Sequence, residues 1–222
     1  MSFNSTQNIK CPKCGQMHTM TVWNSITAKT EPDLKKDILE RKINIFTCPD
    51  CSQMALMPSH LLYNDEDKKL MIYFAPCNTP EEKMTLFAQT KETTKDEIKS
   101  LTDYNLRFVT TYNELMEKIL IFDAGFNDKV IEFLKMMILV QEPQKASSRI
   151  AMYGKAENDY IEFMVQDKTE NQVYTSHIPR STYDTIEKEL LHSGVKFKSF
   201  DWEIVDLDYS SRLLTGMNNQ LF

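Results

Sequence analysis

Two short stretches, Cys11-Pro12-Lys13-Cys14-Gly15 and Cys48-Pro49-Asp50-Cys51-Ser52, decide how the first third of the chain folds. In each stretch two residues separate the cysteines, a spacing at which one tight turn can point both sulfurs at a single cation. Thiolates suit zinc because they supply both affinity and negative charge at tetrahedral corners. We therefore predict a structural Zn2+ site with Cys11, Cys14, Cys48 and Cys51 as ligands. Iron accepts the same ligands, so the sequence leaves zinc and iron open.

Other roles for these cysteines fit the sequence less well. Inert buried cysteines have no need of two matched pairs, and a redox Cys-x-x-Cys needs one pair at the start of a helix. Pro12 and Pro49 fix φ inside each turn, and Gly15 offers the left-handed backbone that often follows the second ligand. Ser52 stands where a second glycine is expected, a departure that costs about 1 kcal/mol.

The histidines nearest to the cysteines are His18 and His60. Either could donate a hydrogen bond to a ligand sulfur or replace a ligand. Because four thiolates already complete the set, we expect both to be surface or edge residues. No catalytic residue is predicted, since four thiolates leave the metal no open position.

The segments between and after the cysteine pairs predict a small antiparallel sheet with an inserted helix. Residues 20–28 alternate in polarity like a half-buried strand, and Pro32 lies near the start of a short helix that runs to Arg41. Further strands are predicted from four apolar stretches, at residues 43–47, 54–57, 61–63 and 70–74. Residues 76–80, with two prolines, read as a boundary.

The remainder alternates between helical and strand patterns. A helix is expected to start at Thr79. The polar residues 91–99 predict an exposed helix or a mobile connection, and residues 106–110 form a short apolar run. Gly125 and Asn127 separate two amphipathic helices, which predicts a helical hairpin. Strands are then expected at 149–153, 160–165, 172–178 and 200–208, with a helix at about 181–193.

The predicted class is therefore α+β. An N-terminal zinc-ribbon-like antiparallel β module with an inserted helix is expected over residues 1–76, a helical region over 77–145, and a C-terminal α/β segment over 146–222.

Several of these stretches together resemble the CpXC family of prokaryotic proteins. The resemblance includes both Cys-Pro-x-Cys motifs with thirty-three residues between them, and the flanking Val22-Trp23-Asn24-Ser25-Ile26, Ile45-Phe46-Thr47 and Leu70-Met71-Ile72-Tyr73. It covers roughly residues 7–76, and residues 107–135 are similar to the helical region that follows in many members. The resemblance implies a bacterial, zinc-ribbon-like module with the four cysteines as ligands. It implies no assigned reaction or partner.

Net charge and composition argue against several classes of function. The net charge of −6 argues against a general affinity for nucleic acid or anionic membrane. Residues 1–76 hold nine basic and eight acidic side chains, so the acidity belongs to the remainder. The sequence has no apolar run long enough for a membrane span and no signal-peptide pattern, and four metal-type thiols with one odd cysteine, Cys77, suit a reducing cytoplasm.

The five glycines form none of the familiar phosphate-binding or nucleophile motifs, and His-Glu-x-x-His is absent. Cys77 is expected to be a small buried residue, and the acids Asp201, Glu203, Asp206 and Asp208 are expected to form the solvated face of a strand. We expect a non-catalytic interaction module with an unknown protein partner. The alternatives are a nucleic-acid-associated zinc ribbon and an enzyme with a site between the N- and C-terminal parts.

Overall fold

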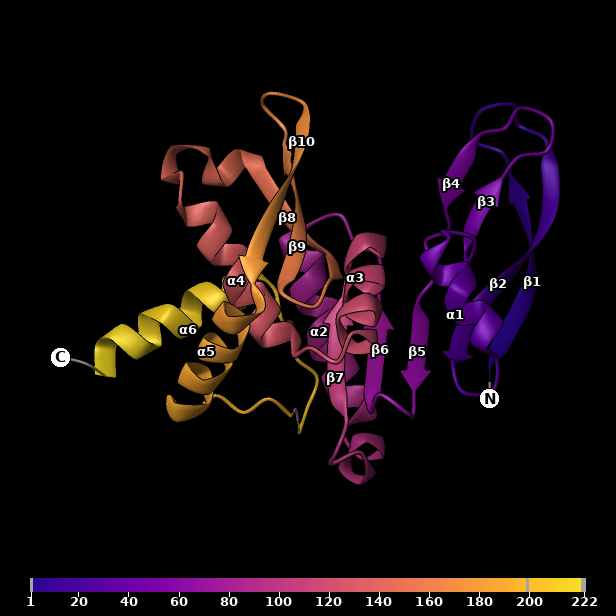
Figure 1. Cartoon of the computed structure of the whole chain (residues 1–222). Coiled ribbons are helices and arrows are strands. Elements are labelled where there is room, and N and C mark those ends of the chain that lie inside the picture. Colours follow the sequence, from indigo (N-terminus) through magenta and orange to yellow (C-terminus); the bar gives the residue numbers. More distant parts are fainter. Residues whose placement is uncertain (1, 199, 221–222) are drawn as a thin grey trace. The chain divides into compact units, whose positions relative to one another are not determined.

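The computed structural model describes residues 2–198 and 200–220, with side chains of the last helix described up to residue 215. Helices and strands are mixed along the chain (Figure 1), as the α+β prediction requires. The chain divides into two compact units, Met1–Met116 with Ser199–Glu203 and Glu117–Lys198 with Ile204–Phe222. The three-part division expected from the sequence stays a prediction.

The first unit contains a five-stranded sheet in the order β1-β2-β5-β6-β7. Its strands are β1 (Phe3–Lys10), β2 (Met17–Thr27), β5 (Leu61–Asp65), β6 (Leu70–Phe74) and β7 (Asn105–Val109). β1 with β2 and β5 with β6 are antiparallel, whereas β2 with β5 and β6 with β7 are parallel. The sheet is therefore mixed: within residues 1–76 the predicted antiparallel pairing holds for β1 with β2 and for β5 with β6, and it is wrong for β2 with β5.

Alternate residues of β5 and β6 lie on opposite faces of this sheet. Every second residue of the two strands is buried, namely Leu61, Tyr63 and Asp65 of β5 and Leu70, Ile72 and Phe74 of β6. The intervening Leu62, Met71 and Tyr73 pack with Leu106 and Trp202 and with Phe87 from α2 (Pro80–Thr94). The helix start expected at Thr79 is confirmed, and the Thr79 side chain caps the α2 N-terminus by accepting a hydrogen bond from the Glu82 N–H. A 3-10 turn, Glu97–Ser100, follows.

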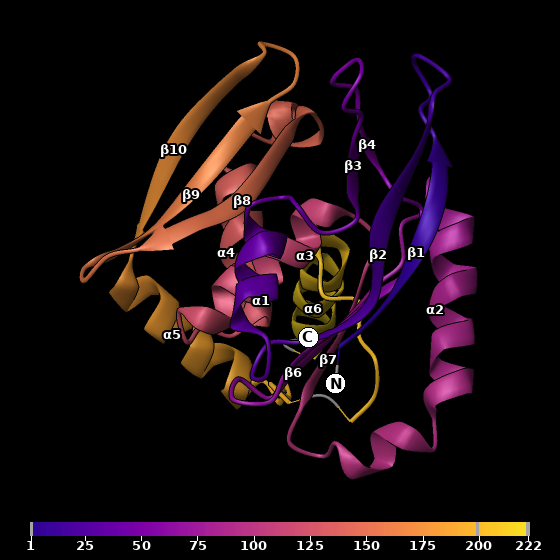
Figure 2. The same cartoon turned by 90° about the vertical axis from the view of Figure 1, so that its right-hand side faces the viewer.

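A second, two-stranded ladder belongs to the same unit. It pairs β3 (Ile45–Thr47) with β4 (Met54–Leu56), and helix α1 (Pro32–Leu39), with Pro32 in its first turn as predicted, precedes it. The loops that close the β1–β2 and β3–β4 hairpins lie at the same end of the unit (Figure 1, Figure 2). This end holds both cysteine pairs.

The second unit combines helices with a three-stranded antiparallel sheet in the order β10-β9-β8. The strands are β8 (Arg149–Ala156), β9 (Tyr160–Asp167) and β10 (Gln172–Pro179). The helices are α4 (Asp128–Val140), a 3-10 turn over Pro143–Ser148, α5 (Arg180–His192) and α6 (Leu207–Gln220); α3 (Tyr112–Asp123) begins in the first unit. Ile161, Phe163 and Val165 are buried on one face, as predicted, and the Asn127 side chain caps α4 by accepting from the Lys129 N–H.

The strand predicted at residues 200–208 is wrong. Glu203 forms one isolated β-bridge with Arg107. Helix α6 begins at Leu207, and the Asp206 carboxylate before it accepts a hydrogen bond from the Tyr209 N–H at 3.0 Å. Trp202 and Val205 are both buried, but in different surroundings. The segment therefore alternates in polarity without pairing as a strand. Trp202 donates to Thr94, whereas the carbonyl of Val205 accepts from Lys118.

Candidate metal centre

Each cysteine pair lies in a turn that we call a knuckle, Cys11–Gly15 for the first and Cys48–Ser52 for the second. In the first knuckle, the N–H of Cys11 donates to the Gln16 carbonyl at 2.8 Å and the N–H of Gly15 donates to the Cys11 carbonyl at 3.0 Å. In the second, the matching bonds from Cys48 and Ser52 are both 2.9 Å long. The φ angles of Gly15 and Ser52 are +76° and +57°. The two knuckles therefore have the same backbone design, and Ser52 adopts the left-handed conformation expected of glycine.

Asn44 holds the second hairpin beside strand β2. Its amide accepts from the Trp23 N–H at 2.8 Å and donates to the Trp23 carbonyl at 2.8 Å, and it also donates to Ser59. Asn44 is buried, with a φ of +54°, a region that asparagine tolerates better than most residues. This side chain thus links the two hairpins that carry the cysteines.

The four sulfurs converge at one point. The distance is 3.6 Å both from Cys11 Sγ to Cys51 Sγ and from Cys14 Sγ to Cys48 Sγ, and all four lie within 4.8 Å of one another. A tetrahedron with Zn–S bonds of about 2.3 Å has edges of about 3.8 Å, so the cluster already has the right size. Each knuckle contributes one sulfur to each of the two 3.6 Å contacts. The residues that the sequence predicted as ligands are therefore positioned to hold a metal ion together.

A protein-family model described as "CpXC protein" matches residues 9–135 of the chain, which is more than half of its length. The chain belongs to the CpXC family. The match begins just before the first knuckle and ends within α4, so it includes both cysteine pairs and the helices α1, α2 and α3. No curated protein and no solved structure matches this CpXC chain.

The thiols of the CpXC chain influence one another's ionisation. A hydrogen bond from the Cys14 N–H is the largest influence on Cys11 and lowers the pKa of its thiol to about 6. The Gln16 N–H favours the Cys14 thiolate, but desolvation and the neighbouring sulfurs outweigh it and raise the pKa of Cys14 to about 12. Thiolates crowded at this distance repel one another, and a divalent cation among them removes that repulsion.

Burial differs across the cluster. Cys11 and Cys48 are 2% and 1% exposed and form a small core with Phe46, against which Ile9, Met20, Cys51 and Met57 pack. Cys14 is exposed and Cys51 is partly buried. The site is thus closed on the side of the hairpins and open to solvent at Cys14.

The two histidines differ in their relation to the sulfurs. His18 Nε2 lies 3.5 Å from Cys48 Sγ and 3.2 Å from Asp50 Oδ2, so His18 contacts the cluster rather than lying apart from it. His60 instead contacts the Tyr73 hydroxyl at 2.8 Å through Nδ1. Residue spacing could not distinguish the two histidines, because only the fold decides which of them faces the cysteines.

The other residues considered from the sequence lie elsewhere. Cys77 is partly buried, and burial is the largest cause that raises the pKa of its thiol. Asp201 pairs with Lys91, Glu203 pairs with Arg107, and Asp206 caps α6. Three of the four acids of this segment thus have separate structural partners.

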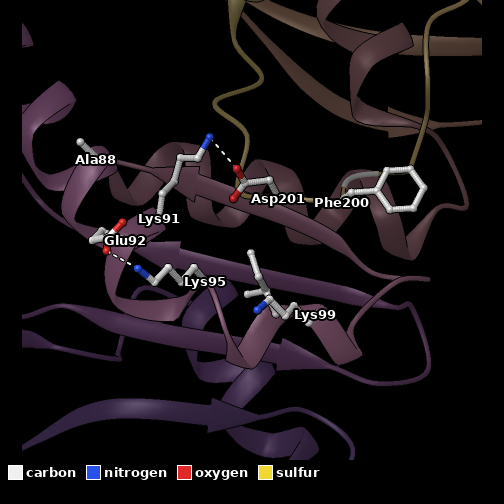
Figure 3. A pocket seen from close by; sticks show the side chains of 8 residues that line it. Ala88, Lys91, Glu92, Lys95, Lys99, Phe200 and Asp201 are labelled. Carbon is white, nitrogen blue, oxygen red and sulfur yellow. Dashed lines mark hydrogen bonds and ion pairs between the residues drawn. The ribbon is translucent and has the colours of Figure 1, made fainter.

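A surface hollow of about 520 Å3 lies between α2 and the segment that contains Phe200 and Asp201 (Figure 3). Three lysines line it, and each is paired with a carboxylate: Lys91 with Asp201, Lys95 with Glu92 and Lys99 with Asp96. Its charges are therefore largely balanced within the protein, and an anionic ligand would have to break these pairs. In the part of the chain that the structure describes, no helix is long and apolar enough to cross a bilayer.

Proposed function

We propose that Cys11, Cys14, Cys48 and Cys51 hold one structural zinc ion, and that this zinc stabilises a non-catalytic interaction module. The observation that carries the proposal is the convergence of four sulfurs, with two sulfur–sulfur distances of 3.6 Å and all four atoms within 4.8 Å of one another. Four thiolates complete the coordination of zinc and leave no position for substrate or water. Thiolate ligands also require reduced cysteines, which favours a cytoplasmic setting.

The surface beside the knuckles supports the interaction role. Met17 and Met54 each lie three residues after the second cysteine of a knuckle, and they are 60% and 57% exposed. Flexible, polarisable methionine side chains suit a protein-binding surface. A net charge of −6 makes a protein a better candidate partner than a nucleic acid.

Elemental analysis and thermal melting test the metal assignment. Reduced, gently purified protein should contain one zinc per chain and be colourless, because zinc lacks the visible charge-transfer bands of iron thiolates. Cys14→Ser and Cys48→Ser should each lose the metal and melt at lower temperature, whereas Cys77→Ser should keep it. Retention of one equivalent of metal with unchanged melting in either knuckle variant would refute the structural site.

Site-specific photo-cross-linking tests the interaction surface. A photoreactive residue beside the knuckles should capture a discrete partner in host cells, and the double variant Met17→Lys, Met54→Lys should abolish that product without changing the zinc content. Met84→Lys is the matched control, because Met84 is 56% exposed on α2. Cross-linking that persists in the double variant would show that Met17 and Met54 do not form the binding surface.

A further inference from the structure

The two knuckles and the residues after them have nearly the same sequence. Residues 11–18 read Cys-Pro-Lys-Cys-Gly-Gln-Met-His, and residues 48–55 read Cys-Pro-Asp-Cys-Ser-Gln-Met-Ala. Apart from Gly15 and Ser52, the differences are Lys13 against Asp50 and His18 against Ala55. The structure brings together one residue from each of these differences, since His18 from the first hairpin contacts Asp50 of the second knuckle. The residues that break the internal symmetry thus connect the two halves of the site.

The geometry of His18 fits a donor shared between two anions. Its Nε2 atom is 3.5 Å from Cys48 Sγ and 3.2 Å from Asp50 Oδ2, and its ring centroid lies 5.7 Å from that of Phe46. The His18 side chain is only 17% exposed, whereas that of Asp50 is 54% exposed. Packing against Phe46 and the contact with Asp50 therefore fix the imidazole with one nitrogen directed at Cys48.

The negative charge of a four-thiolate zinc site explains why the contact of His18 with the Cys48 sulfur is stabilising. A divalent ion and four thiolates sum to roughly two net negative charges, and hydrogen-bond donors to the sulfurs lower the cost of burying that charge. Cys48 is 1% exposed, so water cannot replace the His18 donor easily. A donor directed at the sulfur stabilises the metal-bound thiolate, so the loss of that donor should weaken the hold of the site on the metal.

We propose that His18 and Asp50 form a clasp that regulates how fast the metal leaves the site. His18 is a positioning residue that shares its Nε2 hydrogen between the Cys48 sulfur and the Asp50 carboxylate, and the contact with Asp50 holds the imidazole in place across the two hairpins. The clasp also keeps the second knuckle against the first. This proposal rests on the four-cysteine zinc site proposed above.

Release of zinc to a chromophoric chelator at fixed pH measures the clasp directly. Loss of a partner of a metal ligand typically lowers metal affinity about 10–100-fold. We expect this loss to lie in the release step, so His18→Leu should release zinc about 10–100 times faster than the unchanged protein. His18→Gln should restore slow release, because the glutamine amide nitrogen lies the same number of bonds from the backbone as Nε2. Asp50→Asn should give an intermediate rate. Lys13→Ala, at the equivalent position of the first knuckle, and His60→Leu should not change the rate.

A spectrum separates the hydrogen bond from a general loss of packing. In protein loaded with Co2+, the thiolate-to-cobalt charge-transfer band should move to lower energy in His18→Leu and return in His18→Gln, because a sulfur without its donor is more easily oxidised. Equal release rates and identical bands in all variants would overturn the clasp. So would two metal ions per chain that fall to one in Asp50→Asn, because His18, Cys48 and Asp50 would then hold a second ion. Absence of metal from the unchanged protein would instead refute the zinc site itself.

Discussion

At the scale of single residues, the equivalent positions Gly15 and Ser52 show how much backbone strain the knuckles carry. Both have positive φ, at +76° and +57°, yet only one is glycine. A non-glycine residue in this region costs about 1–2 kcal/mol. A Cβ atom at Gly15 would meet its nearest neighbour, Lys10 Cε, at an ordinary 3.8 Å, so crowding adds little there. The difference between the two positions is therefore mainly conformational.

Reciprocal substitutions should reveal this strain. Ser52→Gly should raise the free energy of unfolding by up to about 1 kcal/mol, and Gly15→Ala should lower it by about 1–2 kcal/mol. Thermal melting of the metal-loaded protein measures both changes. A less stable Ser52→Gly variant would show that the serine side chain makes a contribution larger than the strain.

Residue spacing was sufficient to predict that the four cysteine sulfurs converge. Each Cys-x-x-Cys turn is a local feature that positions one pair of sulfurs. Residue spacing was not sufficient for His18, which we expected at the surface or an edge. Its contact with Cys48 and Asp50 depends on how two hairpins pair, and these residues lie about thirty positions apart in the sequence. The role of Asn44 in linking those hairpins was missed for the same reason.

At the scale of elements, periodic apolar patterns predicted most helices and strands, and the exceptions have identifiable causes. Strand β1 (Phe3–Lys10) has a mostly polar, exposed sequence, because it lies at the edge of the sheet and pairs only with β2. The parallel pairing of β6 with β7 joins segments separated by a helix, and no local pattern shows such a register. Residues 200–208 alternate in polarity without forming a strand, because their partners differ from one residue to the next.

Helices α3 and α4 meet in the second unit through buried charges, which the hydrophobic pattern did not predict. Lys118 contacts Asp128 at 3.1 Å and Glu132 at 3.0 Å, and Lys135 contacts Glu117 and Glu132 at 3.0 Å. Burial is the largest cause that raises the pKa of the Glu117 carboxyl group. One oxygen of this group contacts Lys135, and the other accepts a hydrogen bond from the Tyr153 N–H. These groups depend on one another because each is removed from water.

Lys118→Met should therefore destabilise the second unit far more than removal of a surface charge. The substitution leaves Asp128 without the Lys118 cation and also removes the donor to the Val205 carbonyl, which lies 2.7 Å from Nζ. Breaking a buried ion pair costs about 3–5 kcal/mol. Lys95→Met, which removes an exposed pair with Glu92, should cost less than about 1 kcal/mol. Urea unfolding of the two variants makes the comparison, and equal losses would contradict a structural role for the buried network.

At the scale of the whole molecule, the metal and the hydrophobic cores should support different parts of the chain. Among the described residues, the core at the end that carries the knuckles consists of Cys11, Phe46 and Cys48, and β3 and β4 have three residues each. Such a short ladder has little stability of its own in water. The five-stranded sheet and the second unit have larger sets of buried side chains that do not include a knuckle.

Removal of the metal should consequently unfold the knuckle end alone. After treatment with a strong chelator, amide hydrogen exchange should accelerate over residues 9–20 and 45–57, while β5, β6 and β8–β10 keep their protection, because binding of structural zinc supplies about 10–16 kcal/mol in finger peptides and that contribution is local here. Adding zinc back should restore slow exchange. If exchange instead accelerates equally over both units, the two units share one cooperative transition with the metal site; if it does not change over 9–20 and 45–57, the hairpins are held by contacts other than the metal.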